Sequence, residues 1–260
     1  MTTERPGDEA IGEYLDWDSR FFGVRIGRAV PRRLSAETAA LLLRWCASQQ
    51  IDCVYMLADP GDIQTVRLVE ESGFRCVDIR VTLDRSAADR ARGGAKFDGT
   101  VRNALPSDVT ALRAMARTGF RLSRFYFDPT FSRASVDALY ETWIEKSCNG
   151  YADAVLVAAS GGQVAGYVTC HRDGVVKGRI GLLGVRDDWQ GRGLGHVLLN
   201  AALAWFRESG ASEVYVVTQG RNRAALRLYQ GCGFVIDAVE LWYHRWFTTK
   251  GDDGNETHSV

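Results

Sequence analysis

The sequence predicts an α/β (α+β) fold in two successive halves. Short β-like and helix-like segments alternate in each half, with apolar residues spaced as in half-buried strands and amphipathic helices. Between the halves, residues 84–99 are charged, small and aperiodic and contain a Gly-Gly pair, as in an exposed linker. We therefore expect one domain over 1–83, this linker, a second domain over 100–247 and a disordered tail over 248–260.

The first half is expected to follow the order β-α-β-α-β. Ser35 begins the first helix because a serine side chain can accept a hydrogen bond from the first turn, where Glu37 follows. Gly73 lies where a left-handed residue would end the second helix. The expected strands cover 24–30, 51–57 and 74–83, and the expected helices run from 35 through Trp45 and over 62–72.

The second half begins with two expected helices. Pro106-Ser107-Asp108 opens the first and Ser135 caps the second, with an aromatic-rich loop over 121–130 between them. Gly161-Gly162 joins two apolar runs, which is a strong hairpin signal. The remaining expected elements are strands over 154–160, 163–171, 176–185, 213–218 and 234–246 and helices over 194–208 and 222–231.

Composition argues against several classes of protein. The 32 lysines and arginines balance the 32 aspartates and glutamates, so no net field would draw the chain to nucleic acid or to an anionic membrane. The 6 cysteines form no C-x-x-C pair and have no nearby histidine spacing typical of zinc, so we expect no metal site. We see no signal peptide and no apolar run long enough to cross a membrane, and we expect a cytoplasmic protein.

One short fragment occurs in both halves. RLVEESGF at 67–74 and RLYQGCGF at 227–234 align at an offset of 160, with Arg, Leu, Gly and Phe matched. In each copy a helix would run through a glycine into a strand. A match this short can arise by chance, and a degenerate duplication is the alternative explanation. The first half has no glycine-rich loop.

The segment over 180–206 combines an apolar strand, a glycine loop at 190–195 (Gln-Gly-Arg-Gly-Leu-Gly) and a helix with an apolar face. Glycines let successive backbone N–H groups point into one concavity at the positive end of a helix, where a pyrophosphate can bind. The loop lacks the G-K-[ST] of a P-loop. A dinucleotide-binding loop would need glycine or alanine at position 196, where this chain has His196.

This loop resembles the R/Q-x-x-G-x-G/A motif that binds CoA in the GNAT acetyltransferase superfamily. Asn222, Ala225, Tyr229 and Gly233-Phe234 match a second GNAT signature, N-x-x-A-x-x-x-Y-x-x-x-G-F. The resemblance implies a GNAT fold, with a mixed, mostly antiparallel central sheet flanked by helices, preceded by a degenerate partial GNAT half. It also implies acetyl-CoA as co-substrate, bound by Leu183, Gly184, Val185, Gln190, Gly191, Arg192, Gly193, Leu194, Gly195, Asn222, Ala225 and Tyr229.

Segments from nearly the whole chain resemble the dTDP-fucosamine acetyltransferases, namely LDWDSRFFGVRIGRA, SRFYFDPTF, ETWIEKS and LWYHRW. The resemblance implies transfer of the acetyl group to the 4-amino group of a dTDP-4-amino-4,6-dideoxyhexose, by direct attack in a ternary complex. Two alternatives stay open: a GNAT acting on another small-molecule or peptide amine, and a CoA-binding module without catalysis. The first half would supply a wall of the acceptor cleft or a dimer surface, so a homodimer is among the expected assemblies.

Acyl transfer from a thioester needs groups for the oxyanion and for the departing thiolate. Backbone N–H groups near 183–185 would bind the oxyanion. The resemblance assigns Tyr229 as the catalytic acid, and a phenol with a reference pKa of about 10 keeps its proton at neutral pH; a core aromatic is the structural alternative.

Phe125, Tyr126 and His171 are the candidate substrate-binding residues, with packing between the two halves as the alternative for the aromatic residues. No single general base stands out among His171, Asp187, Asp188, Glu240 and His244, and ordered water could accept the proton instead.

Overall fold

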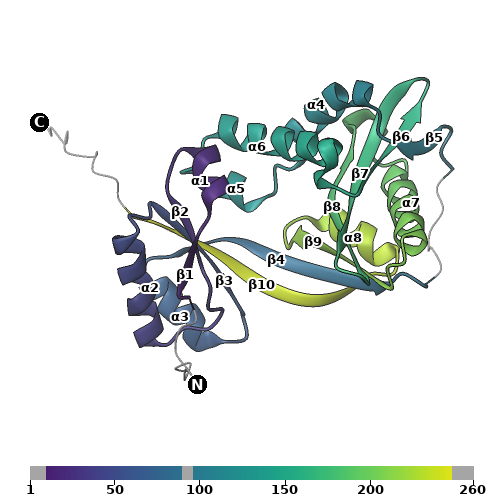
Figure 1. Ribbon diagram of the computed structural model, residues 1–260. Coiled ribbons are helices and arrows are strands. Elements are labelled where there is room, and N and C mark those ends of the chain that lie inside the picture. The colour runs from purple at the N-terminus through teal and green to yellow at the C-terminus, as the bar shows by residue number, and fades with distance from the viewer. Residues whose placement is uncertain (1–9, 90–95, 248–260) are drawn as a thin grey trace, which may run out of the picture. The chain divides into compact units, whose positions relative to one another are not determined.

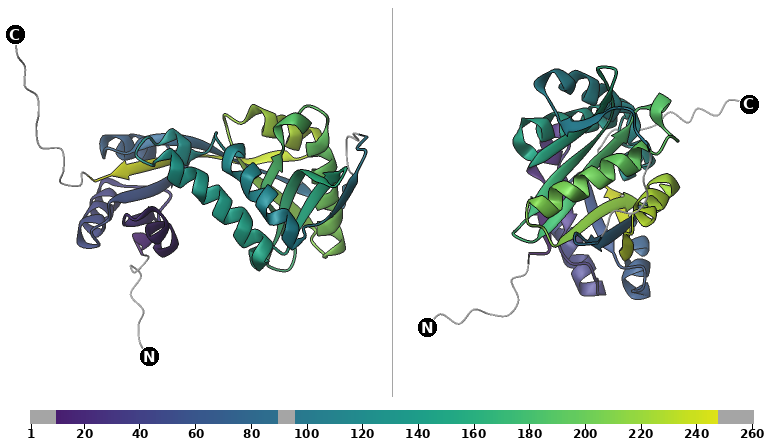
Figure 2. Two further views of the ribbon diagram at one scale, coloured as in Figure 1. Left: turned by 90° about the horizontal axis from the view of Figure 1, so that it is seen from above. Right: turned by 90° about the vertical axis from the view of Figure 1, so that its right-hand side faces the viewer.

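The computed structural model describes residues 10–89 and 96–247, and the chain divides into two compact units (Figures 1 and 2). The first unit comprises residues up to Val77 together with those from Glu240 onward. The second comprises Asp78–Val239. Each unit has its own buried core, so each is described by itself.

The first unit is a small sheet with helices. β1 (Gly12–Tyr14) pairs antiparallel with β2 (Ile26–Ala29), β2 pairs parallel with β3 (Cys53–Ala58), and the end of β10 (Val235–Trp246) pairs antiparallel with β3. Its helices are α1 (Asp16–Phe22), α2 (Ala36–Ser48) and α3 (Ile63–Glu71). Leu42 of α2, Met56 of β3 and Val69 of α3 are fully buried in one core.

The second unit is built on a larger sheet with the strand order β4-β9-β8-β7-β6-β5. These strands are β4 (Arg75–Ser86, in this unit from Asp78), β5 (Thr100–Asn103), β6 (Ala154–Ser160), β7 (Gln163–Asp173), β8 (Lys177–Val185) and β9 (Glu213–Gln219). β8 and β9 run parallel, and the other neighbours run antiparallel. This confirms the predicted mixed, mostly antiparallel sheet.

Helices flank this sheet. They are α4 (Val109–Gly119), α5 (Arg124–Phe127), α6 (Arg133–Lys146), α7 (Leu194–Glu208) and α8 (Arg223–Gly231). α7 covers one face of β6–β8, and α4 and α6 pack together on the other face (Figure 2). α7 is apolar where it meets the sheet, because Leu198, Ala202 and Phe206 follow the helical period and are fully buried.

The observed division of the chain differs from the expected boundary at 84. β4 continues to Ser86 and pairs with β9 as far as Ser86 opposite Glu213, so residues 78–86 belong to the second unit. At the other end, Glu240–Trp246 belong to the first unit because this part of β10 pairs with β3. Strand pairing over such sequence distances leaves no mark in local composition. Residues 90–95 of the expected linker and the expected tail over 248–260 lie outside the described residues.

Candidate active site

The site begins where two parallel strands separate. β8 and β9 are paired from Lys177 opposite Glu213 to Ile180 opposite Val216, and the described residues show no pairing beyond that point. β8 nevertheless continues to Val185, held on its other edge by β7. The backbone of Leu183, Gly184 and Val185 therefore faces a gap between two strands, as the sequence predicts, and backbone donors and acceptors in such a gap can bind amides of a ligand.

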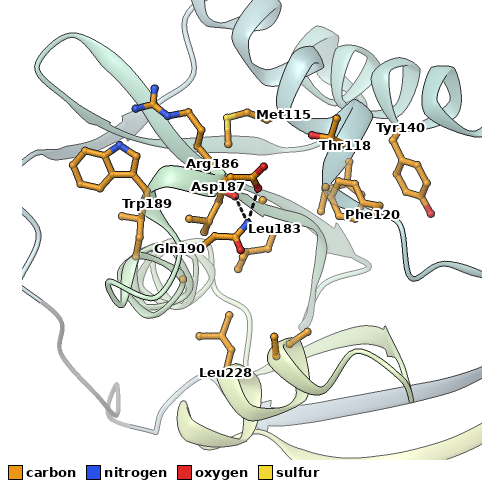
Figure 3. A pocket seen from close by; sticks show the side chains of 18 of the residues that line it. Met115, Thr118, Phe120, Tyr140, Leu183, Arg186, Asp187, Trp189, Gln190 and Leu228 are labelled. Atoms are coloured by element: carbon orange, nitrogen blue, oxygen red, sulfur yellow. Dashed lines mark hydrogen bonds between the residues drawn. The ribbon is translucent and has the colours of Figure 1, made fainter.

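A cavity of about 1580 Å³ lies at this gap (Figure 3). Its walls come from β8, the loop after it, the first turn of α7, the end of β9, and the helices α8, α4 and α6. Eleven of the twelve residues predicted to bind CoA line this cavity: Leu183, Gly184, Val185, Gln190, Gly191, Gly193, Leu194, Gly195, Asn222, Ala225 and Tyr229. The fold thus brings the strand end at Leu183, the glycine loop and Tyr229 of α8 to one site.

The glycine loop takes the conformation that its sequence predicts. Gly191 and Gly193 have φ values of +73° and +79°, and a side chain is strained at either position. Gly193 is also the residue from which α7 begins, so the loop delivers its backbone to a helix N-terminus, where anions bind favourably. Gln190 donates hydrogen bonds to the Val185 carbonyl (3.2 Å) and to the Asp187 carboxylate (2.9 Å), which fixes the start of the loop (Figure 3).

Arg192 is the predicted cofactor residue that does not line the cavity. Its guanidinium lies 5.3 Å from the centre of the Trp189 ring. A cation–π contact of this kind stabilises the loop.

α8 presents the second predicted motif. Asn222 caps this helix, since its Oδ1 accepts a hydrogen bond from the Ala225 N–H at 3.1 Å. Tyr229 lies on the cavity side and is 6% exposed, with its ring in edge contact with Phe234 at 5.8 Å between centres. Burial raises the pKa of the Tyr229 phenol well above its usual range, so it carries its proton at neutral pH.

The opposite wall was not predicted from the sequence. Met115 and Thr118 of α4, Phe120 and Tyr140 line this part of the cavity (Figure 3). Phe120 stacks on Tyr140 with 4.7 Å between ring centres, and burial is the main cause that raises the pKa of Tyr140 to about 12. The helices that carry these residues have the apolar spacing of ordinary core-facing helices. Only the cavity beside them identifies them as site residues.

Three predicted substrate-binding residues lie away from this cavity. Phe125 is buried against Phe131 and Trp143, and the Tyr126 hydroxyl donates a hydrogen bond to Asp137. His171 is 5% exposed, and burial lowers the pKa of its imidazole. These side chains are held by packing and hydrogen bonds within the second unit.

The other candidate general bases also divide into residues beside the cavity and residues in the first unit. Asp187 lines the cavity and accepts the Gln190 hydrogen bond, whereas Asp188 is ion-paired with Arg186 at 2.6 Å, which lowers the pKa of its carboxyl. Glu240 and His244 belong to the first unit, where Glu240 pairs with Arg32 and His244 stacks on Tyr55.

Two kinds of feature are absent from the described part of the chain. Within residues 10–89 and 96–247, no group of three or more His, Cys, Asp or Glu residues is arranged to hold a metal ion. No helix in these same ranges is both long and apolar enough to span a bilayer.

Comparison with known proteins indicates an acetyltransferase. The profile of the Acetyltransferase (GNAT) family matches residues 117–234. The chain is 28% identical over 239 residues to the dTDP-fucosamine acetyltransferase of Escherichia coli O6:H1, which covers 90% of this chain and 97% of that protein. It is 30% identical over 142 residues to the spore coat polysaccharide biosynthesis protein SpsD of Bacillus subtilis, covering 54% of this chain and 48% of that one.

Solved structures share the fold. A GCN5-related N-acetyltransferase from Sphaerobacter thermophilus matches with a TM-score of 0.65 at 19% identity, over 90% of this chain and 76% of that one. A tandem GNAT protein from the clavulanic acid biosynthesis pathway matches with a TM-score of 0.57 at 12% identity, over 86% and 76% of the two chains.

A strand gap, a glycine loop before a helix and a buried tyrosine lie together at one cavity of the second unit. Residues 117–234 of the second unit form a GNAT acetyltransferase domain, and this chain is an acetyl-CoA-dependent N-acetyltransferase.

Proposed function

We propose that this enzyme transfers the acetyl group of acetyl-CoA to the 4-amino group of a dTDP-4-amino-4,6-dideoxyhexose. The observation that carries the proposal is the extent of the similarity to the dTDP-fucosamine acetyltransferase, which covers 97% of that protein and therefore includes the first unit. A similarity confined to CoA binding would cover the second unit alone.

The cofactor would bind along the strand gap. The backbone of Leu183, Gly184 and Val185 would pair with the pantetheine amides, and the loop from Gln190 to Gly195 would hold the pyrophosphate at the start of α7. One N–H of the β8 backbone would stabilise the oxyanion that forms when the amine attacks the thioester carbonyl. These interactions use main-chain groups, which the fold fixes in advance.

Tyr229 would donate a proton to the departing CoA thiolate. The phenol lines the cavity on α8, and burial keeps it protonated at the pH where the enzyme works. When the amine attacks, the carbon–sulfur bond breaks, the sulfur takes the electron pair and the tyrosine proton neutralises it. The attacking amine loses its own proton to ordered water or to Asp187, the carboxylate in the wall beside the loop.

The charges in the cavity wall favour a sugar acceptor over a polycation. The carboxylates among its described lining residues are Asp108, Asp187 and Asp188. Asp108 is ion-paired with Arg102 at 2.6 Å and Asp188 with Arg186, so their charges are already balanced. A polyamine or an aminoglycoside needs several uncompensated carboxylates, whereas a deoxysugar suits the apolar and hydroxyl-bearing wall of Met115, Thr118, Phe120 and Tyr140.

The test is release of free thiol from acetyl-CoA with a panel of amines. The panel contains dTDP-4-amino-4,6-dideoxygalactose, its gluco epimer, spermidine and a peptide with a free amino terminus. We expect turnover with one or both nucleotide sugars and none with spermidine or the peptide. Turnover confined to the peptide or to spermidine would overturn the proposed acceptor and leave the acetyltransferase assignment intact.

A further inference from the structure

A buried carboxylate lies beside the acceptor side of the second unit without taking part in the chemistry described above. Asp78 of β4 is 3% exposed, and its Oδ1 accepts the Ile79 N–H at 2.9 Å. Arg221 Nη1 lies 3.6 Å from the same oxygen. Burial raises the pKa of Asp78 to about 6, against the opposing effect of Arg221. A group held this way costs stability when ionised, so packing alone does not account for it.

Arg221 makes a second contact on a different segment. Its guanidinium lies 3.3 Å from the centre of the Phe127 ring, at the end of α5. The backbone N–H of Arg124, at the start of α5, also hydrogen-bonds to Asp78. Asp78 therefore holds both ends of α5, one directly and one through the arginine.

The two segments joined in this way form separate walls of the cavity. Phe120, Leu122 and Ser123 line it immediately before α5, and Thr218, Gln219 and Asn222 line it on either side of Arg221. The turn that carries Arg221 is itself fixed to β4, because the Gly220 N–H donates to the Ile79 carbonyl at 2.7 Å. Asp78 thus connects the turn before α8 with the segment that follows Phe120, Leu122 and Ser123, which form the proposed acceptor wall.

We propose that Asp78, Arg221 and Phe127 form a latch that positions the segment 120–127 against the start of α8 and so sets the width of the acceptor site. The inference rests on the proposed function for the identity of the acceptor. Asp78 is a positioning residue, because it touches neither the acetyl group nor the amine.

The latch depends on the ionisation of one carboxyl. The groups that face Asp78 are Arg221 from the turn before α8, Arg124 from α5 and Tyr140 from α6. Two of them are guanidinium groups. As the pH falls through about 6, Asp78 takes up a proton and its ion pair with Arg221 is lost. The acceptor site loosens, and the KM for the acceptor rises.

The first test compares Asp78→Asn with Asp84→Asn, a half-buried aspartate on the same strand, in the full-length enzyme. We expect Asp78→Asn to raise the acceptor KM about tenfold at pH 8, with kcat and the acetyl-CoA KM within about twofold of the parent. The ratio of the acceptor KM of Asp78→Asn to that of the parent should approach one at pH 5, because the parent then carries a neutral Asp78 as well. Protonation of the amine affects both enzymes equally and cancels in this ratio. Equal acceptor KM values at every pH would overturn the latch.

The second test does not need the acceptor. In hydrogen–deuterium exchange with acetyl-CoA present, the amides of Tyr126 and Phe127, which donate to the Ser123 carbonyl, should exchange faster in Asp78→Asn than in Asp84→Asn. Unchanged exchange contradicts the latch even if the nucleotide sugars turn over. Faster exchange supports it even if they do not, so the two proposals fail independently.

Conservative variants separate positioning from mere stability. Phe127→Tyr keeps the ring beneath Arg221 and should retain the parent acceptor KM, whereas Phe127→Leu should raise it. Because Asp78→Asn removes a buried charge, its thermal midpoint should equal or exceed that of the parent at pH 8. A lowered midpoint together with a lowered kcat would show that Asp78 is only structural.

Discussion

The helix that precedes Phe74 in the first unit and the helix that precedes Phe234 in the second share their backbone design. α3 and α8 each contain nine residues and begin 160 positions apart. Asp62 caps α3 by accepting from the Thr65 N–H, and Asn222 caps α8 by accepting from the Ala225 N–H.

The ends of these helices agree as closely as their beginnings. Gly73 and Gly233 have φ values of +78° and +89°. The N–H of Phe74 donates to the carbonyl of Val69, and that of Phe234 donates to the carbonyl of Tyr229. The strands that follow, Arg75–Ser86 and Val235–Trp246, keep the same offset at both ends. This supports the duplication over a chance match.

The side chains at the matching positions differ where the chemistry differs. Val69 occupies the position that Tyr229 has in the second unit, and Arg33, Leu34 and Ser35 occupy the positions of Gly193, Leu194 and Gly195. The N–H of Leu34 donates to Thr65 Oγ1 at 2.8 Å, and the N–H of Ser35 donates to Thr38 Oγ1 at 2.7 Å. These N–H groups are therefore already occupied by the protein's own side chains.

A hollow at this place in the first unit is lined by the carboxylates of Asp59 and Asp62, which match the neutral amides of Gln219 and Asn222. Arg33 also lines this hollow and lies 3.8 Å from the Asp62 carboxylate, so two carboxylates and one cation leave a net negative charge that disfavours a pyrophosphate. The comparison teaches that the repeated backbone is a scaffold, and that glycines, amides and one tyrosine make the second copy a candidate acetyl-CoA site.

The largest expected effect is at Tyr229, whose matching residue in the first unit is Val69. Tyr229→Phe should lower kcat about 100-fold while the affinity for acetyl-CoA is unchanged, because loss of a general acid removes that order of acceleration. Thiol release and calorimetric titration measure the two quantities. Tyr243→Phe, which removes a buried hydroxyl of the first unit that donates to Glu70, is the matched control and should leave kcat unaltered. A kcat for Tyr229→Phe equal to that of the parent would show that the tyrosine is a core aromatic.

A smaller effect is expected at the glycine loop, where the first unit has other residues. Gly193→Ala should raise the acetyl-CoA KM about tenfold, since an L-residue at positive φ costs roughly 1–2 kcal/mol and displaces the start of α7. Gly210→Ala introduces similar strain after the end of the same helix, at φ +86° with open space around it. It should lower the free energy of unfolding by a similar amount and leave the KM alone. If both variants change the acetyl-CoA KM equally, the change in Gly193→Ala results from lost stability and not from a displaced glycine loop.

Making the second unit more like the first should weaken cofactor binding. Asn222→Asp keeps the helix cap, because both residues cap well, and places a carboxylate where Asp62 lies in the first unit. We expect the acetyl-CoA KM to rise roughly fivefold, about 1 kcal/mol of repulsion, and to recover at high salt. The reverse change, Asp62→Asn, should have no effect on the KM. An unchanged KM for Asn222→Asp would place the pyrophosphate away from this turn.

The smallest effect distinguishes the two phenylalanines. Phe74→Leu and Phe234→Leu should each lower the free energy of unfolding by about 1 kcal/mol, because both rings are buried and leucine fills most of their volume. Only Phe234→Leu should also lower kcat, by about twofold, since that ring supports Tyr229. Chemical denaturation and steady-state kinetics check the pair. Equal kcat values would mean that Tyr229 is positioned by its other neighbours.

Most of the second unit's local structure was predictable because its signals are local. The strand over 154–160 and the helix over 194–208 were predicted to the residue, because the strand is a continuous apolar run that ends at Gly161 and the helix has a regular apolar period between Gly193 and Gly210. α1 was missed because its seven residues are mainly charged and aromatic and have no side-chain cap. α5 was missed because four residues give no helical period.

The sequence by itself determined the proposed cofactor side of the site, because the glycine loop and the helix with Asn222 and Tyr229 are continuous stretches whose backbone geometry follows from residue type. Only the tertiary structure decided the acceptor side, where Met115, Phe120 and Tyr140 meet across helices that have ordinary core patterns. It also decided which aromatic residues of the loop pack inward, and that β4 and β10 each contribute to both units. These outcomes depend on pairing and packing between distant segments, and the local spacing of residues carries no record of them.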